Sequence, residues 1–181
     1  MAAALAAIYQ ETRIRIDFRS AENGLMSKSW PNSRALRKYR FSETGRPYLI
    51  TTCCRDREPV FSDIRLGEIV ADEIRISDCN CKTYTFAFVV MPDHLHWLFE
   101  LRPRHDLSEV VRCLKGRSSY RVNTVRQLSG AIWQTGFHDR AVRAGESLET
   151  LGNYIIQNPV RAGLVRNVDD YPLWNMMWRR G

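Results

Sequence analysis

Residues 83–101 read TYTFAFVVMPDHLHWLFEL, and this stretch decides the fold. Its first nine residues are apolar on both faces, which is typical of a strand at the centre of a sheet. A turn at 91–93 leads into HLHWLFEL, residues 94–101, which predicts a second strand. Because side chains alternate along a strand, one face is expected to carry Leu95, Trp97, Phe99 and Leu101, and the other His94, His96, Leu98 and Glu100.

Strand and helix signals alternate on either side of this hairpin. YLITTCCR, residues 48–55, is rich in β-branched residues and predicts a strand. Isoleucines spaced among charged residues over 63–77 predict a helix. Asp106 and Glu109 resemble a capping box that begins another helix. The expected core stripe of that helix is Leu107, Val110, Val111, Leu114, Val122 and Val125.

Two further segments complete the pattern. Residues 131–143 predict a strand or loop, and residues 147–158 predict a last helix that Pro159 ends. The resulting order β, α, β, β, α, β, α is the split βαβ plan. It predicts an α+β, ferredoxin-like βαββαβ fold: an antiparallel sheet with helices packed on one face, followed by a C-terminal helix. The expected organisation is a loosely ordered leader over 1–37, one domain over 38–168 and a tail over 169–181.

Composition narrows the class of function. Of 181 residues, 27 are Lys or Arg against 20 Asp or Glu, and the net charge of +7 favours a polyanionic partner. No apolar run approaches the roughly 20 residues of a membrane span. The five cysteines fit neither a zinc knuckle nor a disulfide framework, which favours reduced, mostly buried thiols. We therefore expect a cytoplasmic, nucleoid-associated protein with no membrane partner.

His94 and His96 are the first candidate for chemistry. Their i, i+2 spacing on a strand sends both imidazoles to the same face. Two neutral imidazoles on a rigid strand supply two ligands of a divalent metal site and leave positions open for substrate. From the spacing alone, two histidines that merely line a sheet face remain the favoured alternative.

Tyr154 and Asn158 are the second candidate. They lie one turn apart on the last expected helix, so a phenol and an amide project side by side. A tyrosine hydroxyl can attack phosphorus, and an amide oxygen can complete a hard-cation site. Spacing alone favours a half-buried tyrosine and an asparagine that closes the helix before Pro159.

The third candidate combines aromatic and basic residues over 133–143 and 158–165. Aromatic rings can stack on unpaired bases while guanidinium groups hold phosphates. Core aromatics beside solvated arginines explain the pattern nearly as well. The residues expected to contact DNA are Arg117, Arg121, Trp133, Gln134, Phe137, His138, Arg140, Arg143 and Arg161.

Three motifs in this order and spacing, VVMPDHLHWLF, WQTGFHDRAVR and YIIQNPVRAGLV, resemble the REP-associated tyrosine transposases. These are small relatives of the single-tyrosine transposases in the HUH endonuclease superfamily, and the resemblance covers about residues 38–175. It implies that His94 and His96 bind Mg²⁺ or Mn²⁺, that Tyr154 on the C-terminal helix is the nucleophile, and that Asn158 supplies a third ligand. DYPLWNMMW, residues 170–178, departs from the family pattern of a tryptophan and small serines after DYP.

The resemblance also implies an activity. Family members cut single-stranded DNA beside imperfect palindromic hairpins through a 5′-phosphotyrosine intermediate, which serves DNA transposition. A single nucleophile implies that cleavage and rejoining alternate at one site or that two molecules cooperate. The expected partner is therefore single-stranded or hairpin DNA, bound by a monomer or a weak homodimer.

Three alternatives stand beside this interpretation. Tyr120, on the basic side of its helix, is a rival nucleophile with a weaker motif match. A domesticated descendant could bind hairpin DNA or RNA without cutting it. An unrelated phosphohydrolase for small nucleotides would require a third histidine after HxH or a second HxT motif, and neither is present in the sequence.

Overall fold

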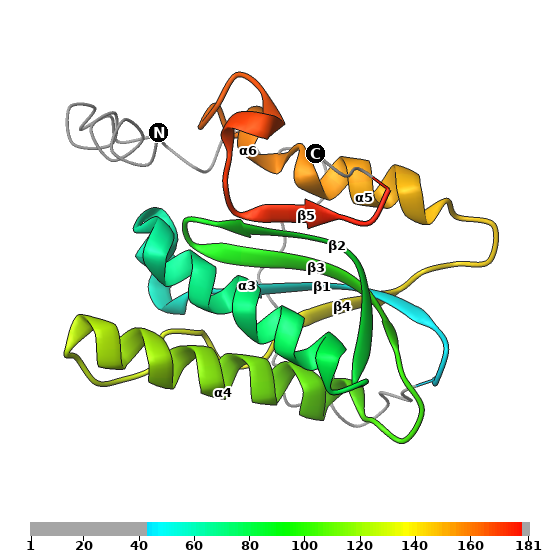
Figure 1. Cartoon of the computed structure of the whole chain (residues 1–181), viewed down its shortest axis with the longest axis horizontal. Coiled ribbons are helices and arrows are strands. Elements are labelled where there is room, and N and C mark those ends of the chain that lie inside the picture. The colour runs from blue at the N-terminus through cyan, green and yellow to red at the C-terminus, as the bar shows by residue number, and fades with distance from the viewer. Residues whose placement is uncertain (1–42, 179–181) are drawn as a thin grey trace. The chain divides into compact units, whose positions relative to one another are not determined.

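A five-stranded antiparallel sheet frames the part of the chain that the computed structural model describes, residues 43–178. Its strand order is β4-β1-β3-β2-β5 (Figure 1). The main elements are β1 (Pro47–Cys53), α3 (Ile64–Cys79), β2 (Thr83–Met91), β3 (His94–Leu101), α4 (Leu107–Arg126), β4 (His138–Ala141), α5 (Leu148–Ile156), α6 (Asn158–Arg161) and β5 (Trp174–Met176). Short 3-10 turns cover Arg55–Arg57, Val60–Ser62 and Val168–Asp170. The first four strands have the predicted βαββαβ connectivity, so the ferredoxin-like prediction is confirmed.

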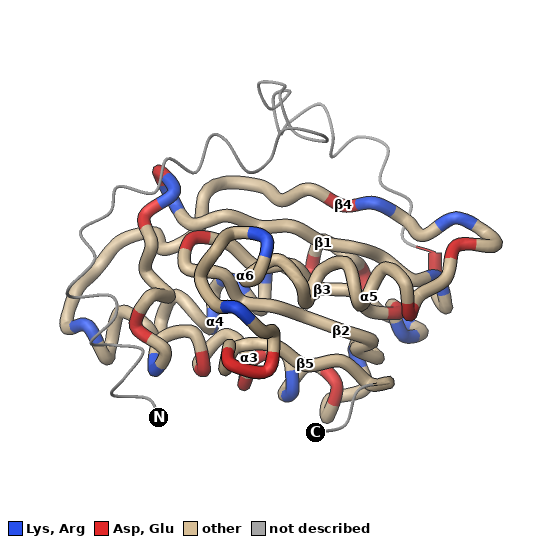
Figure 2. The backbone as a smooth tube through the Cα atoms, turned by 90° about the horizontal axis from the view of Figure 1, so that it is seen from above, with Lys and Arg blue, Asp and Glu red and all other residues tan. Residues whose placement is uncertain are grey.

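Helices cover both faces of the sheet. Val70 of α3 and Leu114 of α4 belong to the apolar cluster that contains Leu95. Ile155 and Leu98 belong to a second cluster, which joins α5 to the opposite face. Figure 1 shows α4 and α5 on opposite sides of the sheet, and Figure 2 looks at the side that α5 covers. Helix α5, followed by the short α6, therefore covers one face, and α3 and α4 pack together on the other.

The alternation predicted for residues 94–101 is confirmed. Leu95, Trp97, Phe99 and Leu101 join the larger cluster, whereas Leu98 joins the smaller one. β2 and β3 pair from Thr83 with Leu101 to Met91 with His94, which leaves only Pro92 and Asp93 to make the turn. The face of His94 and His96 is thus the face that α5 covers.

The long helix α4 begins as predicted, but its buried stripe ends earlier than expected. The Asp106 carboxylate accepts a hydrogen bond from the backbone N–H of Glu109 at 3.0 Å. The buried stripe also includes Ser118, which the apolar pattern missed because serine is polar. Its burial is tolerated because its hydroxyl donates a hydrogen bond to the carbonyl of Leu114. The prediction that Val125 is buried is wrong: no later residue of α4 than Val122 belongs to the core cluster, and Val125 is 55% exposed.

Glycine at position 152 lets α5 lie close to the sheet. A Cβ atom at this position would lie 3.2 Å from Cε of Met176 and 3.4 Å from Cβ of Ala87. Because such distances are tighter than, or at the limit of, ordinary contact, a larger residue would push the helix outward. The close approach sets the height of α5, and with it that of Tyr154, above the sheet.

The segment after residue 168, expected to be a tail, completes the sheet. Residues 174–176 form β5, which pairs with β2 from Ala87 with Met176 to Val89 with Trp174. Leu173 is buried, and the Tyr171 hydroxyl donates a 2.7 Å hydrogen bond to the carbonyl of Val90. The predicted leader over 1–37 lies outside the described residues.

None of the five cysteines, all within residues 43–178, takes part in a disulfide bond, and they differ in burial. Cys53 and Cys54 are buried, Cys113 is intermediate, and Cys79 and Cys81 are exposed, so the expectation of mostly buried thiols holds only for β1 and its end. Burial raises the pKa of Cys54 to about 12, so this thiol stays protonated and unreactive. Among the residues from 43 to 178, no helix is long and apolar enough to cross a bilayer.

We predict that Tyr171→Phe lowers the free energy of unfolding by about 1 kcal/mol, because it removes the buried hydrogen bond that ties the C-terminal segment to β2. Urea denaturation measures this change. Tyr84→Phe is the matched control, since Tyr84 is 47% exposed, and it should leave the stability within about 0.5 kcal/mol of wild type. Equal stabilities of the two variants would contradict the assigned role of Tyr171.

Candidate active site

The imidazoles of His94 and His96 face one another on β3. Their Nε2 atoms are 3.2 Å apart and their ring planes are nearly perpendicular, at 88°. Two imidazole nitrogens that each lie about 2.1 Å from one cation are separated by 3.2 Å when the angle at the cation is about 100°. The spacing of the pair therefore suits two adjacent ligands of a single divalent ion.

Each ring is held at its other nitrogen. Nδ1 of His94 lies 2.6 Å from the carboxylate of Asp93, which in turn accepts a 3.1 Å hydrogen bond from Arg57. Nδ1 of His96 lies 2.9 Å from the hydroxyl of Thr51, its direct cross-strand partner on β1. Sequence reasoning missed these three residues. The only sequence signal for Asp93 is its position next to His94. Thr51 could not be found from local sequence, because its contact with His96 depends on the register between two strands.

The electrostatic surroundings keep the pair ready for a cation. Burial, and then the proximity of His94, Arg161 and Arg57, hold the pKa of His96 well below its ordinary value. Burial raises the pKa of Asp93, but its contacts with His94 and Arg57 outweigh this effect and lower it. At neutral pH His96 is therefore uncharged, as a metal ligand must be, and Asp93 is ionised.

Arg161 links the predicted nucleophile to the histidine pair. Its guanidinium carbon lies 4.0 Å from the centre of the Tyr154 ring, and its Nη2 donates a 2.8 Å hydrogen bond to the Tyr154 carbonyl. The same side chain is close enough to lower the pKa of His96. Tyr154 is 52% exposed, so its ring is accessible on this side of the sheet. Tyr120 is 75% exposed on α4, across the sheet from the pair.

Asn158 is occupied in this arrangement. Its side-chain oxygen accepts a 2.6 Å hydrogen bond from Arg161, and its amide donates one to the carbonyl of Ile155. It begins α6 after a single turn residue, Gln157, at the end of α5. Asn158 is thus next to the nucleophile candidate, as the sequence predicted, but its donor atom is turned to Arg161.

The donor set for a cation consists of two imidazoles. Within residues 43–178, no group of three or more His, Cys, Asp or Glu side chains is arranged around a common point as metal ligands. The spacing of the two Nε2 atoms, the uncharged state of His96 and the anchored Nδ1 atoms fit a divalent ion with open positions.

A family model described as "Transposase IS200 like" matches residues 44–158, which include both histidines, Tyr154 and Asn158. The chain belongs to this transposase family. The match ends within α6, so the segment that forms β5 lies beyond it.

Individual relatives of this IS200-like transposase agree with that assignment. A REP-associated tyrosine transposase of Escherichia coli K12 is 31% identical over 87 residues, which cover 48% of this chain and 50% of the relative. A Haemophilus influenzae protein with the provisional name of REP-associated tyrosine transposase is 29% identical over 107 residues, or 51% and 60% of the two chains. The chain thus spans half to three fifths of the curated relatives it matches.

A solved structure of a REP-associated tyrosine transposase bound to a REP hairpin shares the fold. It superposes with a TM-score of 0.62 and 24% sequence identity, and the match covers 82% of each chain. This likeness supports the α+β architecture of the chain, including its antiparallel sheet.

Strand pairing divides the predicted DNA contacts between two faces. His138 of β4 pairs with Thr51, which pairs with His96, so these three side chains form a row on one face. Arg140 pairs with Leu49 on the same face. Its guanidinium is held by Glu146, which also accepts a hydrogen bond from the backbone N–H of Arg143.

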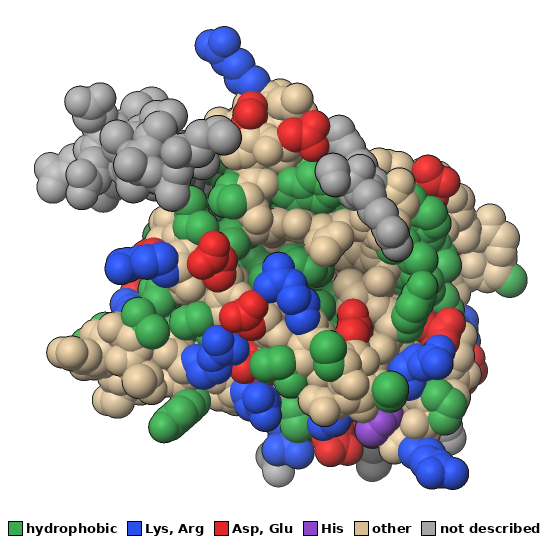
Figure 3. All heavy atoms as spheres, viewed as in Figure 1, with side chains coloured by type: hydrophobic (Ala, Val, Ile, Leu, Met, Phe, Trp, Pro, Cys, Tyr) green, Lys and Arg blue, Asp and Glu red, His purple; other side chains and the backbone are tan. Residues whose placement is uncertain are grey.

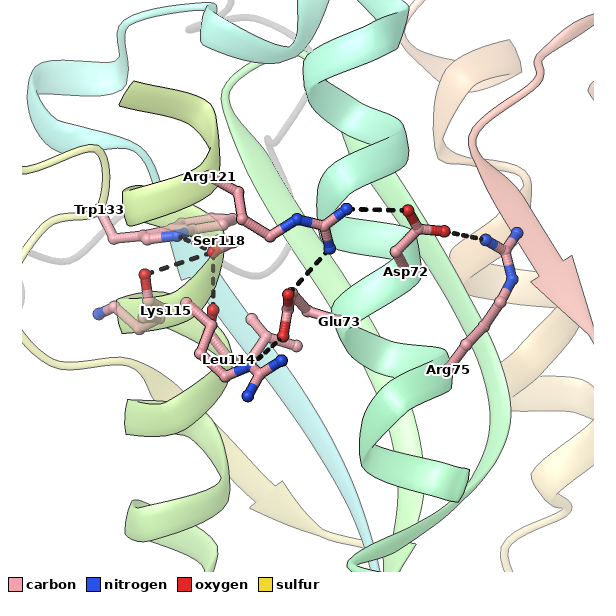
Figure 4. A network of polar contacts seen from close by, with 9 residues as sticks. Asp72, Glu73, Arg75, Leu114, Lys115, Ser118, Arg121 and Trp133 are labelled. Atoms are coloured by element: carbon pink, nitrogen blue, oxygen red, sulfur yellow. Dashed lines mark hydrogen bonds and ion pairs between the residues drawn. The ribbon is translucent and has the colours of Figure 1, made fainter. Parts of the chain in front are cut away.

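Arg117 and Arg121 lie on the other side of the sheet. They project from α4 and form ion pairs with Glu73 of α3, whose side chain is 1% exposed (Figure 4). Arg121 also contacts Asp72. Figure 3, which looks at the molecule from the β5 edge of the sheet, shows basic and acidic side chains close together around α3. The structure therefore places both arginines in a network that neutralises a buried glutamate, away from the histidine pair.

Trp133 and Phe137 differ in accessibility. Trp133 is 5% exposed, its ring packs on Phe61, and its indole N–H donates to the hydroxyl of Ser118 (Figure 4). A ring held in this way is closed to a nucleobase, contrary to the stacking expected for Trp133. Phe137 is half-buried and packs against the larger apolar cluster.

Lys115 of α4 supports the chain leading to β4. Its ammonium group donates to the carbonyls of Gln134 and Gly136 at 2.7 and 2.6 Å. Lys115 therefore fixes the backbone of Gln134 and makes no contact with its side-chain amide through this hydrogen bond. Burial lowers the pKa of Lys115 from 10.5 to about 8, against a smaller opposing influence of Cys53.

This pKa predicts how stability depends on pH. Between pH 8 and 10.5 the unfolded chain keeps the Lys115 proton that the folded protein has lost. Because the unfolded state then binds more protons, the contribution of Lys115 to the free energy of unfolding rises with pH across this window. Urea denaturation should show wild type gaining stability relative to Lys115→Met from about pH 8 to pH 10. A difference that stays constant would contradict this prediction.

Proposed function

We propose that this IS200-like transposase is a metal-dependent single-strand DNA endonuclease and rejoining enzyme that acts through a 5′-phosphotyrosine at Tyr154. The observation that carries the proposal is the continuity of the site. The Nε2 atoms of His94 and His96 face each other at 3.2 Å, and Arg161 both influences His96 and covers the ring of Tyr154. A nucleophile and a cation-binding pair are thus joined by one basic side chain.

The cation in this proposal is Mg²⁺ or Mn²⁺ held by His94 and His96. When bound, it neutralises charge on the phosphodiester and on the leaving oxygen. Asn158 joins the pair as a third ligand only when Arg161 releases its side-chain oxygen. A DNA phosphate attracts the same guanidinium, so binding of the substrate and release of Asn158 are coupled in this mechanism.

The chain supplies the nucleophile and its position. The Tyr154 oxygen forms a bond to phosphorus, and the bond from phosphorus to the 3′ oxygen breaks. The phenol proton passes to solvent, which reaches the half-exposed ring, and solvent supplies a proton to the 3′ oxygen, which leaves as a hydroxyl. Attack by a 3′ hydroxyl on the phosphotyrosine reverses the step, so strand rejoining needs no nucleotide cofactor.

The DNA partner is proposed from the relatives and from the basic residues of this face. One solved relative is bound to a REP hairpin. In this chain Arg161, Arg140 and His138 lie on the face of the histidine pair, and the half-buried ring of Phe137 directly precedes His138. Guanidinium groups suit phosphates, and an exposed ring suits an unpaired base. Arg143 joins this set through the carboxylate it shares with Arg140.

A hairpin-binding protein without cleavage activity is the second candidate. The hydrogen bond between Arg161 and Asn158 favours it, because it occupies an oxygen that the family uses as a ligand. Cleavage of a labelled hairpin oligonucleotide in the presence of Mn²⁺ discriminates between the two candidates.

We predict that Tyr154→Phe abolishes both cleavage and the covalent protein–DNA adduct while hairpin binding persists. The substitution removes one oxygen and keeps the ring under Arg161. A denaturing gel of 3′-labelled DNA detects the adduct as a protein-sized band. Tyr120→Phe, the matched control on the far side of the sheet, should retain substantial activity. An adduct that survives in Tyr154→Phe but disappears in Tyr120→Phe would transfer the role to Tyr120.

We predict that His96→Ala reduces cleavage by more than about 100-fold, because it removes one of two cation ligands from the site. The fold should persist, since the strand packs through Leu95 and Trp97 on its other face. Circular dichroism checks the fold, and a cleavage assay with Mn²⁺ measures the rate. His105→Ala, outside the site before α4, is the control that should cleave normally. Full activity of His96→Ala would show that the cation assignment is wrong.

A further inference from the structure

We infer that Asp93, held in place by Arg57, is a positioning residue that presents the Nε2 lone pair of His94 to the cation. The inference rests on the proposed cation site and assigns a task to two residues outside it. Its basis is a continuous chain of contacts from Arg57 to Asp93 to His94 to His96 to Thr51.

The Asp93 contact decides where His94 carries its hydrogen. An ionised carboxylate can only accept a hydrogen bond, so at 2.6 Å from Oδ1 the Nδ1 atom of His94 must be the donor. A neutral imidazole has one N–H, and its other nitrogen then holds the lone pair. Nε2 of His94 is therefore the acceptor atom, and it is the atom that faces His96.

The partner of His96 is of a different kind. A hydroxyl can donate or accept, so Thr51 supports either tautomer of His96. When His94 is neutral, a hydrogen on Nε2 of His96 would bridge the 3.2 Å to His94, and Thr51 would donate to Nδ1 of His96. With the hydrogen on Nδ1 instead, Thr51 would accept it, and both Nε2 lone pairs would be free to hold a cation. One ring is thus fixed and the other adapts.

Arg57 holds the carboxylate in the orientation that this role requires. Its Nη1 binds Oδ2 of Asp93 at 3.1 Å and leaves Oδ1 for His94. The side chain of Asp93 is 11% exposed, so water competes little for either oxygen. Partners of this kind orient ligating histidines, and their loss typically weakens metal binding by about 10- to 100-fold.

The experiment uses the full chain without DNA and has two readouts. Long-range ¹⁵N–¹H NMR of the metal-free protein reports the ring tautomer of His94, with the four histidines assigned by single substitutions. The electron paramagnetic resonance signal of free Mn²⁺ reports affinity. The variants are Asp93→Asn, Arg57→Gln and the control Asp56→Asn. Asp56 lies next to Arg57 in the turn Arg55–Arg57, and its side chain is 89% exposed. Asparagine tolerates the left-handed φ of 53° at this position.

We expect His94 in the wild type to carry its hydrogen on Nδ1. In Asp93→Asn, whose amide can donate or accept, we expect mixed tautomers and Mn²⁺ affinity lower by about 10- to 100-fold. Arg57→Gln should show a smaller loss, and Asp56→Asn should match wild type. Melting curves establish that each variant is folded.

Two results would overturn the inference. One is a wild-type His94 with its hydrogen on Nε2, which decides the matter even if a variant fails to fold. The other is a folded Asp93→Asn protein with wild-type tautomer and affinity. A wild type that binds no Mn²⁺ would instead overturn the proposed cation site, while the metal-free tautomer measurement still tests the contact between Asp93 and His94.

Discussion

The antiparallel pairing of β1 with β3 is the constraint on which the candidate site depends. This register sets Thr51 against His96 and Cys53 against His94, while Leu95 and Trp97 enter the core below. A slip by one residue would exchange the two faces of β3 and bury both imidazoles among leucines and valines. The apolar residues that make the core on one face therefore also place the two histidines on the other face.

Charge is distributed over the two faces for different purposes. On the side of α3 and α4, Arg117 and Arg121 compensate Glu73, a buried carboxylate that would be costly without partners. On the side of α5, Arg161 donates to two neutral acceptors within residues 43–178, the Tyr154 carbonyl and the Asn158 side chain. A phosphate can replace such neutral acceptors far more easily than it can displace a buried ion pair. Arg161 is thus more readily available to a phosphate than Arg117 or Arg121.

The C-terminal segment connects stability to the site. β5 closes the edge of β2, and Gly152 of α5 packs against Met176 of β5 and Ala87 of β2. Tyr171 anchors the same segment to the carbonyl of Val90. The height of α5 above the sheet, and so the position of Tyr154, depends on residues that follow the family match and diverge from its usual pattern.

Local sequence determined the elements and the order of this protein. The apolar run over 83–91, the alternation over 94–101 and the cap at Asp106 each act within a few residues, so periodicity was enough to predict the hairpin, the face of the two histidines and the split βαβ plan. The motif around Tyr154 likewise identified a nucleophile candidate beside Asn158.

Only the tertiary structure determined which side chains contact the candidate site residues. Thr51 reaches His96 across 45 residues of chain, and Arg117 reaches Glu73 across 44. Trp133 looked like a stacking platform until the fold buried it against Phe61. Such pairings are selected by strand register and by how helices pack, which involve segments distant in the chain. Periodicity reports which side of its own element a residue occupies, but only the assembled sheet determines what that side meets.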